Sequence, residues 1–171
     1  AEDVTLAGNA KVSVAGTGVT VQGNIGESAP AYVLELSNTS TTTDSTITLS
    51  GTNTYTGGTT VKGVIAVAAS NTAFGTGGIT VQSNGTAARI SRVQLGANVV
   101  LPVANSFLLD SDAATGTSAI TSYAGDNTTP STAIVNGPVE ILKKVGGGGH
   151  FASTKGSASV LRVMGPVTSP N

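Results

Sequence analysis

Ile-Thr-Leu-Ser-Gly-Thr-Asn-Thr-Tyr-Thr-Gly-Gly-Thr-Thr-Val, residues 47–61, is the stretch of this chain that decides the fold. Apolar residues alternate with threonine at 47–49 and again at 59–61, and this two-residue period predicts half-buried strands. Between the two runs, Gly51, Asn53, Gly57 and Gly58 are residues typical of tight bends. The stretch therefore predicts a strand, a corner and a second strand.

Residues 50–61 resemble, almost position for position, the core string Ser-Gly-x-Asn-Thr-Tyr-x-Gly-Gly-Thr-Thr-Val of the passenger-associated repeat of bacterial autotransporters. The family pattern continues with a short apolar strand, an Ala-Phe-Gly-x-Gly turn and another strand. This chain supplies the strand at 63–67 and Ala-Phe-Gly-Thr-Gly-Gly-Ile-Thr-Val at 73–81. The resemblance covers residues 46–82. It implies an extracellular β-solenoid with a structural or adhesive role, and it implies no catalytic mechanism.

Short alternating segments recur through the rest of the chain, and no stretch keeps the 3.6-residue period of a helix. Most of them follow a Gly or Asn by a few residues, which indicates strands that start just after a corner. We expect strands at 4–6, 12–14, 19–21, 33–36, 47–49, 59–61, 65–67, 79–81, 93–95, 99–101, 133–135, 139–142 and 160–163.

Two all-β architectures fit these strands. We favour a β-solenoid, a right-handed parallel β-helix with ~20 residues in each coil, because the strands are short and the residues small. The alternative is an antiparallel β-sandwich or jelly-roll in which subunits exchange a strand. Asn-Gly at 84–85 and at 136–137 is a hairpin signal and favours that alternative locally.

Three segments interrupt the regular pattern. Residues 37–46 are rich in Ser and Thr, and residues 110–132 combine Asp, Gly, Ser and Thr, so both are predicted to be surface loops. Four glycines at 146–149 predict a hinge. We therefore divide the chain into a solenoid-like body, 1–145, and a second part, 146–171, whose terminal strand is expected to pack on a neighbouring subunit.

Composition excludes several classes of function. Charged residues make up only 10% of the chain and the net charge is −1, so electrostatic repulsion does not oppose association of copies. The eight basic residues are scattered, which argues against nucleic-acid binding. No apolar run approaches the ~18 residues of a membrane-spanning helix. The chain has no cysteine, and its start at Ala-Glu-Asp is what signal-peptide removal would leave, so we expect a secreted protein.

Candidate chemistry is sparse. The single histidine, His150, follows four glycines, a poor setting for a general base that needs fixed geometry. Asp110 and Asp112 would face one side of a strand and are the candidate pair for Ca²⁺, although turn-forming aspartates explain them as well. Tyr55 is either a ligand-stacking platform or a corner aromatic that packs over the neighbouring glycines, and we favour the second interpretation.

The sequence thus predicts a non-catalytic extracellular protein, a self-assembling subunit of a bacterial surface filament, sheath or matrix whose partners are copies of itself. The first alternative is an adhesin or fibre segment that binds glycans at the cell surface. The second is a carbohydrate-active β-helix enzyme that uses the acids at 110–126. We expect no organic cofactor.

Overall fold

The computed structural model describes residues 1–40, 44–83, 90–111, 117–122, 131–143, 148–153 and 159–169. Within these residues all regular structure is β-strand, which confirms the all-β prediction. Every strand pairing is parallel, so the described strands include no pair of the antiparallel alternative.

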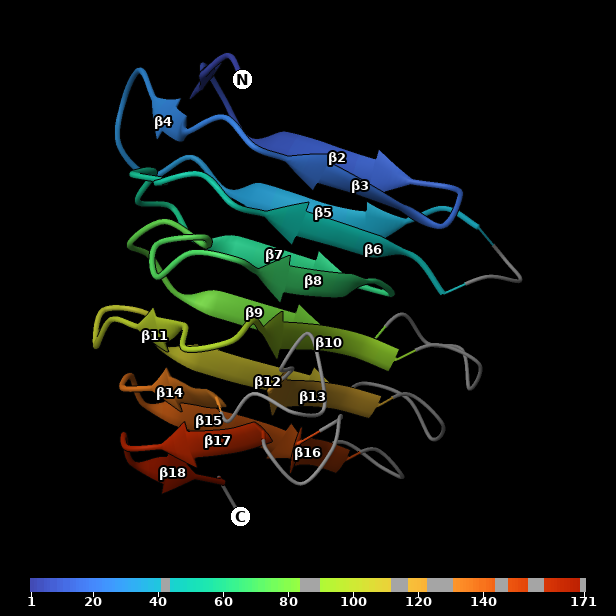
Figure 1. The fold of residues 1–171 in the computed structure, drawn as a ribbon, viewed down its shortest axis with the longest axis vertical. Helices are drawn as coiled ribbons and strands as arrows, with labels where there is room; N and C mark the ends of the chain where they lie inside the picture. The colour runs from blue at the N-terminus through green and yellow to red at the C-terminus, as the bar shows by residue number, and fades with distance from the viewer. Residues whose placement is uncertain are drawn as a thin grey trace.

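The strands form four sheets, and within each sheet all strands are parallel. Successive strands follow one another from the N-terminus at the top of Figure 1 to the C-terminus at the bottom. The seven-stranded sheet contains β2 (Ala10–Val14), β5 (Leu34–Asn38), β7 (Thr59–Lys62), β9 (Ile79–Gln82), β12 (Phe107–Ser111), β15 (Val139–Lys143) and β18 (Val167–Thr168). The six-stranded sheet contains β3 (Gly18–Val21), β6 (Thr46–Leu49), β8 (Ile65–Ala68), β10 (Ile90–Leu95), β13 (Thr117–Ser122) and β16 (Gly148–Ser153). The two small sheets are β1 (Val4–Leu6) with β4 (Ile25–Glu27), and β11 (Val100–Leu101) with β14 (Ser131–Val135) and β17 (Ser159–Val163).

The chain visits these sheets in a fixed order, and we call each round a pass. Each of the first six passes contributes one strand to the seven-stranded sheet and the next strand in sequence to the six-stranded sheet; the last described strands, β17 and β18, extend only a small sheet and the seven-stranded sheet. In the outer passes a strand of a small sheet comes first, and Figure 1 shows β4, β11, β14 and β17 on the same side of the stack. Each pass therefore pairs only with the pass before it and the pass after it.

Pass length varies while the pairing stays in register. Thr59 pairs with Ile79, 20 residues later, but Phe107 pairs with Val139, 32 residues later. The expected spacing of ~20 residues, a solenoid repeat length, holds at the 47–61 stretch and between β1 and β4, where Val4 pairs with Ile25 21 residues later, and is too short for the wider passes. The additional residues lie between the described strands, of which none exceeds six residues.

The core lies between the sheets and consists of inward-facing side chains stacked in register. In the seven-stranded sheet, one such column is almost fully buried from the second pass to the sixth; it contains Leu34, Thr59, Ile79, Phe107 and Val139. The six-stranded sheet supplies a facing column of Ile47, Ala66, Val93 and Ile120, each with no exposed surface. Burial of these columns is the main apolar gain of the fold.

The 47–61 stretch builds the part of the stack where the small sheets are interrupted. Residues 50–58 and 69–78 occupy the place of a small-sheet strand in the two middle passes without forming one. Two aromatic side chains fill the core there: Tyr55 and Phe74 are both completely buried. The Tyr55 hydroxyl lies 2.6 Å from Thr59 Oγ1, so its polar end is satisfied inside the core.

Asparagine amides connect adjacent passes where strand pairing is missing. Asn53 Oδ1 accepts a hydrogen bond from Ile25 N at 2.8 Å, and Asn53 Nδ2 donates to Ala73 O at 2.6 Å. One buried side chain thereby joins three passes. Asn71 Oδ1 accepts from Val100 N in the same manner, at 2.8 Å. Such bonds satisfy backbone groups that would otherwise be buried without a partner.

Three corner glycines, Gly51, Gly137 and Gly165, are required by space, whereas Gly58 and Gly75 also have a positive φ, of 91° and 65°. A Cβ on Gly51 would overlap the carbonyl oxygen of Gly23 in the preceding pass. A Cβ on Gly137 would overlap the carbonyl of Asn105, and one on Gly165 would overlap that of Gly137. The corners of consecutive passes are therefore in direct backbone contact, which any side chain would prevent.

Several predictions made from local sequence were wrong. Residues 110–132 are not one surface loop, because β13 lies within them and its residues 118–122 are all buried. The 37–46 segment is not wholly a surface loop either: Ser37 and Ser45 are buried, with the Ser37 hydroxyl bonded to Ser13. Asn136-Gly137 is a corner between β14 and β15, which belong to different sheets, and so is not a hairpin. Residues 84–85 lie outside the described residues.

The predicted division at 145 and 146 does not interrupt the sheets. Gly148 and Gly149 pair with Thr117 and Ser118 as part of β16. The strands that follow, β17 and β18, pair with β14 and β15 of the same chain. Residues 146 and 147 lie outside the described part, and strand exchange with a neighbour stays a prediction.

We expect Gly51→Ala to destabilise the fold by about 1–3 kcal/mol, the usual cost of overpacking, since its Cβ would displace the Gly23 carbonyl. Gly8→Ala is the matched control, because no atom lies within 4 Å of its added Cβ. Urea unfolding followed by circular dichroism measures both variants. Equal unfolding midpoints for the two would show that backbone contact at the corner does not limit stability.

Candidate functional site

The residues singled out from the sequence do not converge on one site within the described structure. Asp110 lies in β12, paired with Gln82 on one side and Leu142 on the other. Asp112 lies outside the described residues, so the Ca²⁺ pair stays a prediction. The backbone of His150 lies in β16, paired with Ala119. Across the described ranges, no three His, Asp or Glu side chains cluster in a way that would hold a metal ion.

Tyr55 is not a platform for a ligand, because its side chain has no exposed surface. A Cβ on Gly75 would lie 3.1 Å from two atoms of the Tyr55 ring, so the ring packs against this glycine of the next pass, whereas the prediction was made for the glycines near Tyr55 in the sequence. Burial raises the pKa of the Tyr55 hydroxyl above its usual range, while the hydrogen bond with Thr59 opposes that shift. The hydroxyl therefore stays neutral and structural.

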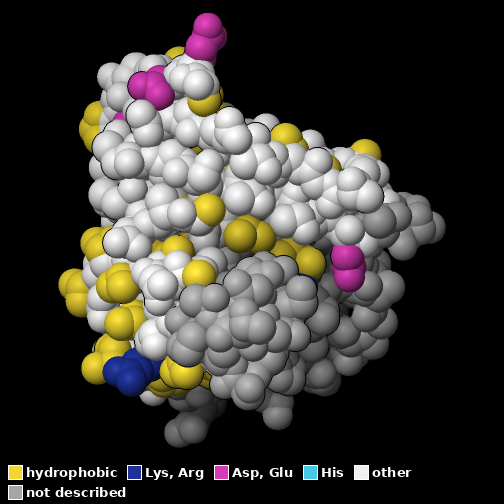
Figure 2. Space-filling model, in the orientation of Figure 1, with side chains coloured by type: hydrophobic (Ala, Val, Ile, Leu, Met, Phe, Trp, Pro, Cys, Tyr) yellow, Lys and Arg dark blue, Asp and Glu magenta, His cyan; other side chains and the backbone are white. Residues whose placement is uncertain are grey.

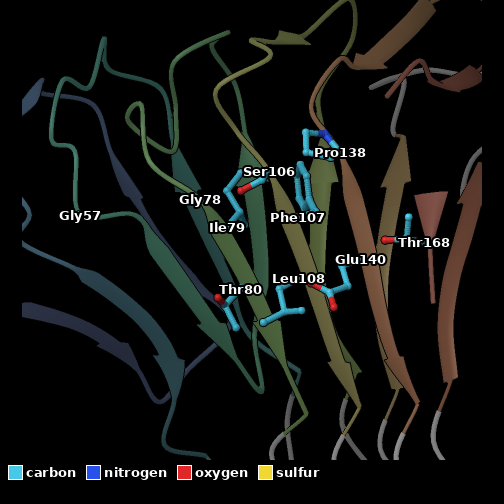
Figure 3. Close-up of a pocket in the computed structure, with 10 residues that line it drawn as sticks. All are labelled: Gly57, Gly78, Ile79, Thr80, Ser106, Phe107, Leu108, Pro138, Glu140 and Thr168. Carbon is cyan, nitrogen blue, oxygen red and sulfur yellow. The ribbon is translucent and has the colours of Figure 1, made fainter. Parts of the chain in front are cut away.

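A groove of about 440 Å³ lies on the outer face of the seven-stranded sheet (Figure 3). One side is an outward column of four residues that pair in register across four passes: Thr80, Leu108, Glu140 and Thr168. The other side is the adjacent corner, which contributes Gly57, Gly78, Ser106 and Pro138. The groove runs along the stack, perpendicular to the strands.

The groove combines one carboxylate with hydroxyl groups and small apolar surfaces. Figure 3 shows the Glu140 side chain between Leu108 and Thr168, with the Thr80 hydroxyl farther along the same column. The Glu140 carboxylate makes no hydrogen bond to the residues that the structure describes, and the residue is exposed. A carboxylate and hydroxyls can bind the hydroxyl groups of a ligand, and Leu108 with Pro138 offers an apolar surface beside them.

The sequence did not indicate this groove. Glu140 stands in an ordinary apolar and polar alternation, Val-Glu-Ile-Leu at 139–142, which predicts only that it faces outward. Its neighbours across the sheet are 32 and 28 residues away, at Leu108 and Thr168. Which residues form such a column depends on the register of strand pairing. Because the passes differ in length, this register cannot be predicted from the spacing of residues in the sequence.

A second polar cluster lies at the N-terminal end of the groove, next to Gly57. Glu27 Oε1 accepts hydrogen bonds from Thr56 N at 2.9 Å and from Thr56 Oγ1 at 2.6 Å, and Glu27 Oε2 accepts one from Tyr32 N at 3.0 Å. Ala31 between these partners has a φ of 74°, in the left-handed region that costs energy for alanine. The Glu27 carboxylate thus holds a strained turn against the next pass.

These bonds stabilise the charged form of Glu27. The hydrogen bond from the Thr56 side chain is the largest cause, and it holds the pKa of Glu27 below its ordinary value of 4.5. A carboxyl group whose pKa is lowered on folding contributes stability at neutral pH. That contribution is lost as the pH falls through the folded pKa.

Comparisons with known proteins add no functional information. No protein-family model, no curated protein and no solved structure matches this chain. The resemblance of residues 46–82 to the autotransporter repeat therefore stays a prediction. The structure contributes one further fact about membranes: among the residues it describes, no helix is long and apolar enough to cross one.

We expect Glu27→Gln to lower the unfolding midpoint at pH 7, because an amide cannot accept all three bonds as strongly as a carboxylate. The difference from the unmodified chain should shrink as the pH falls from about 4.5, the ordinary pKa, through the lower pKa of folded Glu27, because the carboxylate is then protonated. Urea midpoints at pH 7, 5, 4 and 3 test this. Glu140→Gln is the control, and a Glu27→Gln deficit that persists unchanged at pH 3 would contradict the assignment.

Proposed function

We propose that this chain is a non-catalytic structural protein of the bacterial cell exterior. Its passes form a β-solenoid, a right-handed parallel β-helix, that self-assembles into a surface filament, sheath or matrix. The observation that carries the proposal is that apolar side chains are exposed on the outermost described strands of the stack, among them Val19, Phe151 and Val167. An exposed apolar edge of this kind is a surface on which a second copy can pack.

The parallel pairing supports the solenoid. Among the described residues, fourteen strand pairings are parallel, and each links strands of adjacent passes. Connections between parallel strands of one sheet are almost always right-handed, which supports the proposed hand. In such a stack, stability comes from interfaces between neighbouring passes, and the stack acts as a rigid spacer.

Exposed apolar residues support self-assembly. Val19 in β3 and Phe151 in β16 are 40% and 38% exposed. Their partners on the neighbouring strand, Ile47 and Ile120, have no exposed surface. Val4 and Val167 are also exposed and lie beside the buried Ile25 and Val139. Unprotected strand edges with apolar side chains are a template for association with another chain.

The extracellular location rests on the resemblance of residues 46–82 to a secreted repeat. The scarcity of charge is compatible with it, because a net charge of −1 gives little repulsion between neighbouring copies.

The groove favours a second candidate function, glycan binding at a cell surface. An exposed carboxylate beside two threonine hydroxyls matches the hydroxyl groups of a sugar, and Leu108 and Pro138 match its apolar face. The groove is long enough for an extended ligand that follows the stack. This function would coexist with a structural role.

We expect the 171-residue chain to form concentration-dependent multimers. Sedimentation velocity between about 1 and 100 µM, the range in which micromolar contacts respond, should show a sedimentation coefficient that rises with concentration. Electron microscopy of the same samples should show elongated particles. A monomer at every concentration would refute self-assembly.

If the groove binds glycans, a glycan array probed with the chain should give binding signals. Glu140→Gln should lower the affinity behind those signals at least about tenfold. This equals a loss of roughly 1.4 kcal/mol of binding free energy, which one charge-assisted hydrogen bond can supply. Glu35→Gln is the matched control: this carboxylate lies in the same sheet outside the groove and pairs with Lys11 at 2.9 Å. An array without signal, or an equal loss in both variants, would rule against the groove.

A further inference from the structure

We infer that the groove binds a neutral, extended, β-1,4-linked sugar chain that lies along the stack, with one sugar in contact with each pass. The inference rests on the proposed glycan binding and specifies the linkage, the charge and the direction of the ligand.

The spacing of the outward column matches a sugar chain of this kind. Thr80, Leu108, Glu140 and Thr168 pair in register, so each lies one strand spacing, ~4.8 Å, from the next. This spacing is close to the length of one sugar in an extended β-1,4-linked chain. A chain laid across the strands therefore meets a corresponding column position at each sugar, whereas a helical α-linked chain would curve away from the column.

The order of side chains along the column suits the alternation of an extended chain. Successive sugars in such a chain are turned by half a rotation, so every second sugar presents the same edge to the protein. Thr80 and Glu140 lie two passes apart and offer polar groups to the same edge, and Leu108 lies between them. The polar groups can bind sugar hydroxyls, while Leu108 packs on the C–H surface of the intervening sugar.

The corner side of the groove leaves room for the chain. The residues that precede β9, β12 and β15 there are Gly78, Ser106 and Pro138, none of which has a long side chain. A Cβ on Gly78 would meet only Ser106, with Oγ at 3.1 Å and the carbonyl oxygen at 3.7 Å. The space beside Gly78 is therefore open to a ligand.

The charges around the groove favour a neutral ligand. Among the described residues that line it, Glu140 alone is charged. Lys11, farther along the same outward column, pairs with Glu35 at 2.9 Å, and Lys62 stands in the neighbouring outward column beside Gln82. A chain of acidic sugars would bring its carboxylates next to Glu140 without a cation among the lining residues to offset the repulsion.

Isothermal titration calorimetry of the unmodified chain with cello-oligosaccharides tests the spacing. We expect the affinity to rise from the disaccharide to the tetrasaccharide, because each added sugar reaches one more pass, and then to level off, because four residues of the column line the groove. Cellohexaose should bind at least about tenfold more tightly than maltohexaose, its α-linked counterpart, and than hexagalacturonate, a chain of acidic sugars.

A blocking variant tests the place of binding. Gly78→Leu puts a side chain into the groove and should weaken cellohexaose binding at least about tenfold. Gly16→Leu is the matched control, because no atom lies within 4 Å of a Cβ there and Gly16 lies outside the groove. Circular dichroism verifies the fold of both variants. The length series needs no variant, so it decides the question even if Gly78→Leu does not fold.

The outcomes separate this inference from the proposed glycan binding. A stepwise rise to four sugars, with a loss in Gly78→Leu and none in Gly16→Leu, supports the inference. A plateau at two sugars, equal affinity for maltohexaose, tighter binding of hexagalacturonate or undiminished binding by folded Gly78→Leu overturns it and leaves glycan binding standing. If none of these oligosaccharides binds, the inference is overturned, and a silent glycan array then overturns glycan binding as well.

Discussion

Direct contact between backbones at the corners is the constraint on which the rest of this structure depends. Passes can stack at the spacing of paired strands only if nothing separates their corners, and at Gly51, Gly137 and Gly165 even a methyl group would. With the corners in contact, the inward residues of successive strands align and form continuous buried columns. The amide of Asn53 then bridges the passes where strand pairing stops.

The strands that the sequence revealed are those with clear alternation on a half-buried surface. All thirteen predicted segments overlap observed strands, from β1 to β17. The missed strands lack this pattern for physical reasons. In β13, Thr-Ser-Ala-Ile-Thr-Ser, both faces are covered, so Ser118 and Thr121 are buried like Ile120 and the alternation disappears. In β16, Gly148 and Gly149 occupy paired strand positions, although glycine is disfavoured inside strands and therefore argues against a strand there.

The role of the corners was predictable, while the groove was not. Local spacing was enough to place Gly51, Asn53 and Tyr55 at a bend, because Gly and Asn between two alternating runs mark a bend whatever packs against it. The groove depends on Thr80, Leu108, Glu140 and Thr168 lying in one column, and their separations follow no fixed period. A site assembled across passes becomes visible only when the pairing is known.

Unequal pass lengths have a consequence for how sequences of this kind diverge. Twelve residues more or fewer between two strands leave their pairing intact, as the 20-residue and 32-residue passes show. A single insertion within a strand would instead invert which side chains face the core. Insertions and deletions should therefore accumulate in the connections between strands. A regular repeat length would then be lost from the sequence, while the short Gly- and Asn-containing motifs at the corners are retained.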